Sequence, residues 1–169
     1  MLFRSRALPG VWRAARSPAR SALLASLLLF GTGGVLAFMI RGVNVVVPAH
    51  YHGSIVGVTL AFMGLTYVLL PSLGYAVPAQ GWARWVRWQP WVYGGGQLMH
   101  VLGLAWSGGY GVQRKVAGAE QVLRTTGEQI GMGMMGLGGL IAVLGGIMFV
   151  VACLQAMWPR RRQIGRAHV

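Results

Sequence analysis

Two histidines separated by a single residue are the clearest candidates for chemistry in this sequence. His50 and His52 stand in the run VPAHYHG at positions 47–53. Imidazole is a common metal ligand, and metal-binding side chains within membrane segments are usually functional. Successive residues of a helix are rotated by about 100°, so residues i and i+2 point about 200° apart. The spacing therefore predicts two separate partners on opposite sides of one helix rather than two ligands on one metal.

A structural role for the same histidines is the competing interpretation. One or both could be interfacial side chains that hydrogen-bond to backbone carbonyl groups. A third histidine, His100, falls near the outer end of its own apolar stretch, at a depth close to that of His52. We expect His100 to be packed or hydrogen-bonded rather than a metal ligand.

Composition predicts the elements that position these residues. The chain has 169 residues, of which 55% are hydrophobic and 10% charged, whereas soluble domains carry about 25% charged residues. A membrane-spanning helix needs about 20 apolar residues. Four stretches meet that length, at residues 21–40, 48–70, 88–106 and 129–158. The sequence thus predicts an all-α integral membrane bundle of four transmembrane helices.

Small residues and prolines refine this prediction. Small side chains let membrane helices approach closely, and they also leave room for a flat macrocycle; close packing is the expectation for most of them. They recur in the second and fourth stretches at Gly53, Gly57, Ala61, Gly64, Gly131, Gly133, Gly136, Gly138, Gly139, Gly145 and Gly146. Pro48 is predicted to begin the second helix, where its missing N–H is harmless. Pro71, Pro78 and Pro90 are predicted to mark helix boundaries.

The positive charge predicts orientation in the membrane. The net charge of +13 comes from 15 basic residues against Glu120 and Glu128. Because the basic residues fall in short breaks between apolar runs, we expect lipid and not nucleic acid as the partner. One side would hold ten of them and the other four (Arg4, Arg6, Arg13, Arg16, Arg20, Arg84, Arg87, Arg160, Arg161 and Arg162 against Arg41, Arg114, Lys115 and Arg124). The bias predicts a multi-pass protein of a bacterial inner membrane with both termini in the cytoplasm.

The two ends of the chain lie outside the predicted membrane domain of residues 21–158. Residues 1–20 form a basic cytoplasmic segment, and the first apolar stretch is too long for a signal peptide, so we expect it to be retained. Residues 159–169 form a basic tail. Residues 163–169 are typical of sequencing-adapter read-through, so His168 is given no role. We expect the chain to be a fragment of a longer protein.

The stretch from Gly33 to Tyr75 resembles subunit I of the haem–copper terminal oxidases. The tenth helix of that family carries Ala-His-Phe-His, here Ala49-His50-Tyr51-His52, and ends near a Leu-Leu-Pro like that at positions 69–71. Gly33-Gly34-Val35-Leu36 is similar to the end of the ninth helix. The resemblance implies that His50 binds the iron of the high-spin haem at the oxygen site. It implies that His52 is an axial ligand of the low-spin haem.

The third apolar stretch carries a weaker part of the same resemblance. The run HVLGL at residues 100–104 is similar to His-Phe-Leu-Gly-Leu of the eleventh helix. In the family a basic pair follows and contacts the haem propionates. Here the candidates are Arg114 and Lys115, although the spacing is longer and Lys115 replaces an arginine. A solvated pair in an outer loop is the alternative for these two residues.

The resemblance covers roughly residues 26–158 and corresponds to the last four helices of a twelve-helix subunit. The copper ligands and the other low-spin haem ligand belong to earlier helices, so this chain would share two haems, would bind no copper itself and would be inactive alone. The implied function is electron transfer from a cytochrome-type donor to oxygen, coupled to proton translocation. The implied partners are the remaining helices of subunit I and oxidase subunit II.

Two other functions stay open at this point. A stand-alone four-helix cytochrome of the b type would ligate one haem by pairing His52 or His50 with His100. A non-catalytic role would use the glycine-rich helices for packing in a larger complex. The apolar stretches carry no Asp or Glu, so the chain contributes no evident carboxylate to proton uptake. Thr59, Thr66 and Tyr67 are therefore candidate polar lining residues, although hydroxyls that serve helix packing are the expectation.

Overall fold

The described part of the chain is helical throughout. The computed structural model describes residues 17–75, 83–113, 123 and 125–157. These residues form four helices and no strand: α2 (Pro18–Phe38), α3 (Val46–Ser72), α4 (Ala83–Gly109) and α5 (Thr126–Met157). Each predicted apolar stretch falls on one of them, so the all-α prediction is confirmed.

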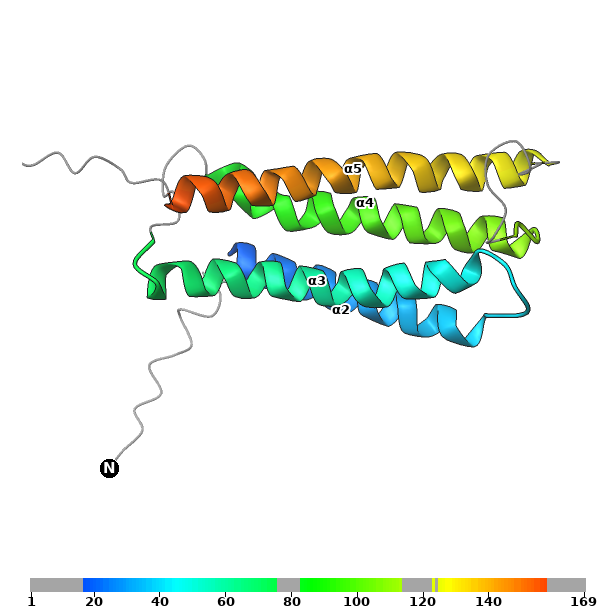
Figure 1. Cartoon of the computed structure of the whole chain (residues 1–169), viewed down its shortest axis with the longest axis horizontal. Helices are drawn as coiled ribbons and strands as arrows, with labels where there is room; N and C mark the ends of the chain where they lie inside the picture. Colours follow the sequence, from blue (N-terminus) through cyan, green and yellow to red (C-terminus); the bar gives the residue numbers. More distant parts are fainter. Residues whose placement is uncertain (1–16, 76–82, 114–122, 124, 158–169) are drawn as a thin grey trace, which may run out of the picture.

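The helices run up and down as two antiparallel pairs, α2 with α3 and α4 with α5 (Figure 1). α4 also packs against both α3 and α2, and so joins the two pairs. At one end of the bundle α2 and α4 end while α3 and α5 begin. We call this the histidine end, because α3 carries His50 and His52 in its first turns.

Polar caps set the starts of α2 and α5 upstream of the apolar runs. Ser17 caps α2 by accepting a hydrogen bond from the Arg20 N–H (3.2 Å), and Pro18 occupies the first turn, a favoured arrangement. At α5 the Thr125 N–H donates to the Glu128 carboxylate and the Glu128 N–H donates to the Thr125 hydroxyl, each at 3.3 Å. This reciprocal pair is a capping box. The apolar stretches at residues 21–40 and 129–158 do not include these polar caps. The predicted starts of α2 and α5 are therefore a few residues late.

The prediction that Pro90 marks a helix boundary was wrong. α4 begins at Ala83 and continues through Pro90. A proline inside a helix removes one backbone hydrogen bond, and here the fully buried Pro90 is accommodated by tertiary packing. Trp85, Trp88 and Trp91 all lie on this helix. Pro48 and Pro71 lie within the first and last turns of α3, and Pro78 falls outside the described residues.

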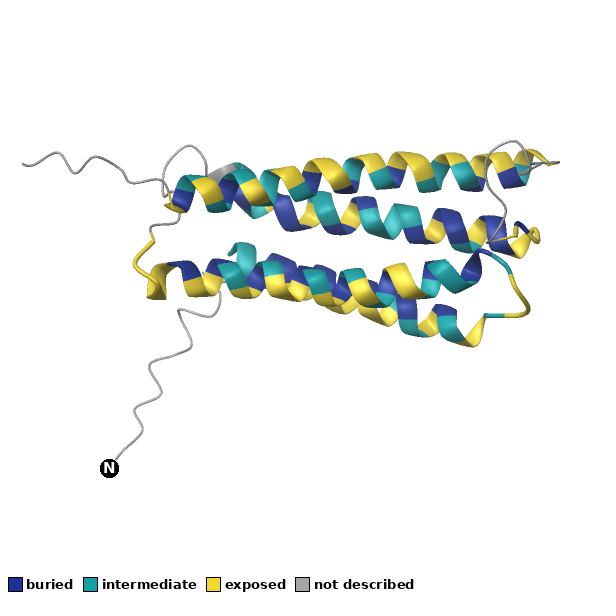
Figure 2. Ribbon diagram, in the orientation of Figure 1, coloured by how far each residue is buried: buried dark blue, intermediate teal, exposed yellow. Residues whose placement is uncertain are grey.

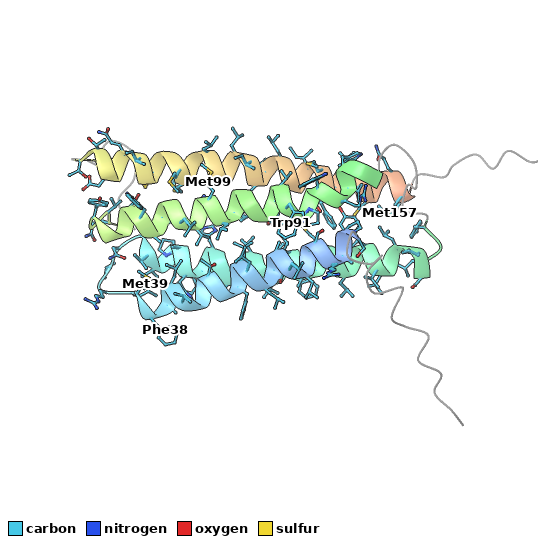
Figure 3. All side chains as sticks on the ribbon, turned by 180° about the vertical axis from the view of Figure 1, so that it is seen from behind. Phe38, Met39, Trp91, Met99 and Met157 are labelled. Atoms are coloured by element: carbon cyan, nitrogen blue, oxygen red, sulfur yellow. The ribbon has the colours of Figure 1, made fainter. Side chains whose placement is uncertain are left out.

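Three of the described helices, α2, α3 and α5, are long and apolar enough to cross a membrane. The most apolar windows of α2, α3 and α5 are only 39%, 39% and 22% buried, and exposed residues follow their outer faces (Figure 2). Phe38, for example, is 92% exposed and projects away from the bundle (Figure 3). An apolar exterior of this kind indicates a membrane protein. α4 is of similar length but more polar.

Glycines set the close approach of the helices, as predicted for the small residues. A Cβ added at Gly53 of α3 would lie 2.7 Å from the Gly33 Cα of α2. Gly131, Gly138 and Gly145 recur every seventh residue of α5 and press on the backbone of α4. Gly133 and Gly136 face open space instead. A heptad of small residues against one neighbour is typical of packed membrane helices.

Candidate functional site

His50 and His52 face different helices, as their spacing predicted. The Nδ1–H of His50 donates to the Gly33 carbonyl oxygen of α2 at 2.8 Å. The ring of His52 lies against the ring of His100 on α4, with centroids 4.8 Å apart and planes at 68°. The two imidazoles therefore have separate surroundings, one against α2 and the other against α4.

The hydrogen bond of His50 determines which of its nitrogens is available. A carbonyl oxygen only accepts, so Nδ1 carries the proton and Nε2 of the neutral ring carries none. Metal-binding histidines are commonly held in this way, with one nitrogen donating to a carbonyl and the other on the metal. The same bond would also satisfy a purely structural histidine. Gly33 makes the contact possible, because a Cβ there would lie 2.5 Å from the Ser54 nitrogen.

His52 has no comparable hydrogen bond within the described residues. Its side chain is exposed on the surface of the bundle, and its ring contact is the one with His100. A ligand outside the four helices could therefore reach His52 at the exposed surface of α3.

His100 is hydrogen-bonded and close to His52, as expected. Its Nδ1–H donates to the Met135 carbonyl oxygen of α5 at 2.9 Å. A ring bound through nitrogen at about 2 Å has its centroid about 3 Å from the metal. Two rings on opposite sides of one iron would thus have centroids about 6 Å apart. The 4.8 Å between His52 and His100 is too short for a porphyrin between them in this packing.

The predicted propionate partners, Arg114 and Lys115, lie outside the described residues, as does His168. The residues just before the pair are described. Gln113 forms an isolated antiparallel bridge with Asn44, and the Val45 N–H donates to the Val112 carbonyl oxygen at 3.0 Å. The chain that leads into Arg114 is thus fixed beside the loop that leads into α3, at the histidine end.

A second polar cluster, which the sequence reasoning missed, joins three helices nearer the opposite end. Gln89 of α4 is fully buried. Its Oε1 accepts from the Tyr67 hydroxyl of α3, and its Nε2 donates to the Gly145 carbonyl oxygen of α5, both at 3.0 Å. Thr59 and Thr66 donate to carbonyl groups four residues earlier in α3, so their hydroxyls bond within their own helix, whereas a role in packing between helices was expected. Tyr67, the third candidate, does link α3 to α4. Gln89 was missed because the adjacent Pro90 was predicted to mark a helix boundary, and a residue at a helix boundary is not expected to be buried.

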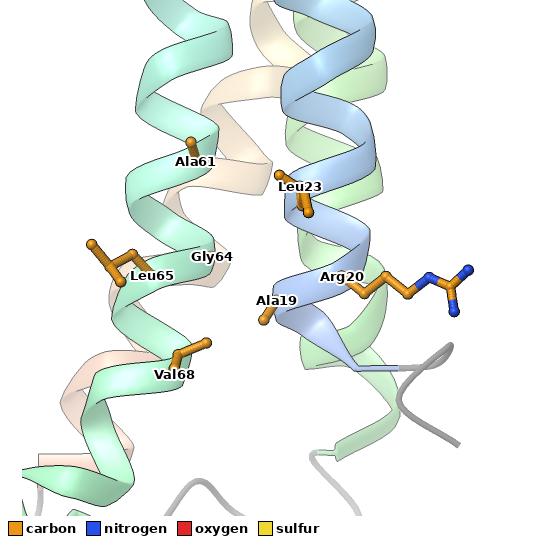
Figure 4. A pocket seen from close by; sticks show the side chains of 7 residues that line it. All are labelled: Ala19, Arg20, Leu23, Ala61, Gly64, Leu65 and Val68. Atoms are coloured by element: carbon orange, nitrogen blue, oxygen red, sulfur yellow. The ribbon is translucent and has the colours of Figure 1, made fainter. Parts of the chain in front are cut away.

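A groove of about 330 Å³ lies between α2 and α3, far from the histidines. Its wall is apolar and includes Ala19, Leu23 and Leu65, whereas the Arg20 side chain points away from α3 (Figure 4). The groove therefore offers no side chain that could ligate a metal or transfer a proton.

Fold and site together define an all-helical protein with membrane-crossing helices and three histidines gathered at one end. No protein-family model matches the sequence. The chain is 40% identical over 147 residues to an uncharacterized protein of Rickettsia prowazekii, a match that covers 82% of this chain and 28% of that protein. It is 39% identical over 56 residues to an uncharacterized protein of Aquifex aeolicus, which covers 33% of this chain and 14% of that one. The chain thus spans little more than a quarter of the length of the Rickettsia relative.

Proposed function

We propose that this chain is the haem-binding C-terminal part of the catalytic subunit of a respiratory terminal oxidase of the haem–copper type. The observation that carries the proposal is that His50 and His52, two residues apart on one long apolar helix, face different neighbouring helices. A helix that must hold two separate irons needs that arrangement, whereas one metal bound by two histidines would need both rings on the same side.

Each histidine has a separate task in this proposal. His50, fixed by its bond to Gly33, presents its bare Nε2 to the iron of the high-spin haem. His52, exposed on the bundle surface, binds the iron of the low-spin haem from the open side. When bound, the haems supply one-electron transfer and oxygen binding. Arg114 and Lys115 are proposed to hold the propionates by charge-assisted hydrogen bonds.

The rest of the enzyme would come from elsewhere. The chain spans 28% of its Rickettsia relative, so a longer protein could supply the helices that resemble the earlier part of subunit I. Those helices would carry the copper ligands and the second low-spin haem ligand, and would cover the exposed faces of α3 and α5. Subunit II and a cytochrome-type donor complete the proposed assembly in a bacterial inner membrane, with both termini of this chain in the cytoplasm.

The contact between His52 and His100 favours a second candidate, a b-type cytochrome with one haem between them. Against it stands the 4.8 Å separation of the ring centroids, which is shorter than the roughly 6 Å that two axial ligands require. The glycines of α5 fix the backbone of His100, so the pair would have to open by rotation of the exposed His52 ring or by a shift of α3 against α4.

Titration of the purified chain in lipid nanodiscs with ferric haem tests the proposal. We expect a Soret band that saturates, and a spectrum without bis-histidine coordination because each iron receives one imidazole from this chain. His50→Ala and His52→Ala should each remove part of the bound haem, and the double variant should remove all of it. Gly136→Ala, which faces open space on α5, is the matched control and should keep both populations. One bis-histidine haem that His100→Ala abolishes would replace the proposal by the b-type cytochrome, and haem binding independent of His50 and His52 would overturn both.

A further inference from the structure

The groove between α2 and α3 lies at the end of the bundle opposite the histidines, where α2 begins and α3 ends. The two helices touch at Gly64, where an added Cβ would lie 2.9 Å from the Cβ of Ala22. Beyond this contact the small side chains of Ala19 and Ala61 leave space between the helices, and Ala19 and Val68 point toward it (Figure 4). The groove is therefore a product of small residues beside a close helix contact.

The groove opens on the outer surface of two helices that are long and apolar enough to cross a membrane. Leu23 of α2 and Leu65 of α3, both exposed, line it. In a bilayer this surface faces hydrocarbon and not water. The volume of about 330 Å³ is at the lower limit of pockets that hold small molecules. Its apolar wall fits part of a flexible hydrocarbon chain.

The charge at this end of the bundle is positive. Arg20 is the charged residue of the groove lining, and its side chain extends away from α3, so its guanidinium stays outside the apolar wall (Figure 4). Among the residues that the structure describes, the Arg20 side chain has no ion pair. Glu128 begins α5 at the histidine end, and Glu120 lies outside the described residues. An anion is thus favoured near the start of α2, where Arg20 lies in the first turn.

We infer that the groove holds one acyl chain of an anionic phospholipid, whose phosphate lies at the start of α2 beside Arg20. Basic pockets between membrane helices on the cytoplasmic side bind anionic headgroups, and arginine binds phosphate by charge-assisted hydrogen bonds. The chain gains van der Waals contacts in a concave apolar wall, which is how packing is stabilised within lipid. The lipid is bound on the side of the membrane that carries the first turn of α2. This inference is independent of haem binding at the histidine end.

The headgroup is tested by titration of the purified, delipidated chain in detergent with phosphatidylglycerol or phosphatidylcholine of equal chain length. Native mass spectrometry counts the lipids bound and gives the affinity. We expect one phosphatidylglycerol to bind more tightly than phosphatidylcholine. Arg20→Gln should weaken phosphatidylglycerol binding about fivefold and leave phosphatidylcholine unchanged. Arg41→Gln, a basic residue at the histidine end, is the matched control and should change neither affinity.

The acyl chain is tested by filling the groove. Ala61→Leu should abolish binding of both lipids at this site, whereas Gly31→Leu, which adds bulk where α2 faces open space, should leave binding unchanged. Circular dichroism identifies a misfolded variant, and Ala61→Val then carries the comparison.

Three results would overturn the inference. Equal affinity for the two lipids that no substitution changes would mean annular lipid only. An effect of Arg41→Gln equal to that of Arg20→Gln would mean attraction by net charge without a site. A dimer in the mass spectrum that Ala61→Leu dissociates would assign the groove to a second copy of the chain.

Discussion

The histidine end and the Gln89 cluster place polar side chains in the same apolar bundle, with opposite outcomes. Gln89 is fully buried and both ends of its amide are used, by Tyr67 and by the Gly145 carbonyl group. His50 lies about 26 Å from Tyr67 along α3. There, His50 and the His100 of α4 each use one nitrogen and leave the other bare, and His52 is exposed. A satisfied polar group in a membrane bundle stabilises helix packing. Imidazole nitrogens that make no hydrogen bond can bind a metal. The histidine end is therefore where we expect chemistry.

The largest expected effect comes from adding a methyl group at Gly138, where α5 is in close contact with the backbone of α4. Gly138→Ala places a methyl group against the His100 backbone, and the free energy of unfolding should fall by about 2–3 kcal/mol. Gly136→Ala is the matched control, because it faces open space on the same helix and should be neutral or stabilising by up to about 1 kcal/mol. Denaturant unfolding in micelles followed by circular dichroism measures both. Equal effects would mean that α4 and α5 are not in backbone contact.

Breaking the Gln89 cluster should be nearly as damaging. Gln89→Leu keeps a similar volume but leaves the buried Tyr67 hydroxyl without its acceptor, which should lower the free energy of unfolding by about 1–3 kcal/mol. The haem affinity of the chain should not change, because the cluster is remote from His50 and His52. A variant as stable as the wild type in the same assay would remove Gln89 as a link between α3, α4 and α5.

Tyr67→Phe tests a single bond of that cluster. It leaves Gln89 bonded to Gly145 and keeps the ring against Phe149, where the centroids lie 5.5 Å apart. We expect a loss of about 0.5–1.5 kcal/mol in unfolding free energy. A double-mutant cycle with Gln89→Leu should show a coupling energy of similar size; additive losses would contradict a direct bond.

The smallest effect on stability should come from His52→Leu. The side chain is exposed and has no hydrogen bond within the described residues, so the free energy of unfolding should change by no more than about 0.5 kcal/mol. The same variant should lose one haem. A loss of stability comparable to that of Gln89→Leu would make His52 a structural residue and remove the contrast between the two regions.

The helices and the separate directions of His50 and His52 could be predicted from the sequence, because they depend on local pattern. The features that depend on contacts between helices could not. Four long apolar runs predicted the helices, and the two-residue spacing of His50 and His52 predicted that their rings face different neighbours. The start of α4 was wrong because Pro90 is a helix breaker in isolation, whereas here it is fully buried inside a helix that continues through it. The burial of Gln89 and the acceptor of His100 depend on partners 56 and 35 residues away in the chain, which no local pattern specifies. The roles of Arg114 and Lys115 stay a prediction.

The central claim is that His50 and His52 hold two irons independently. Native mass spectrometry of the haem-loaded chain counts the haems bound by each variant. We predict two for the wild type, one for His50→Ala, one for His52→Ala and none for the double variant. A wild-type chain that carries a single haem, or a single substitution that releases every haem, would contradict the account.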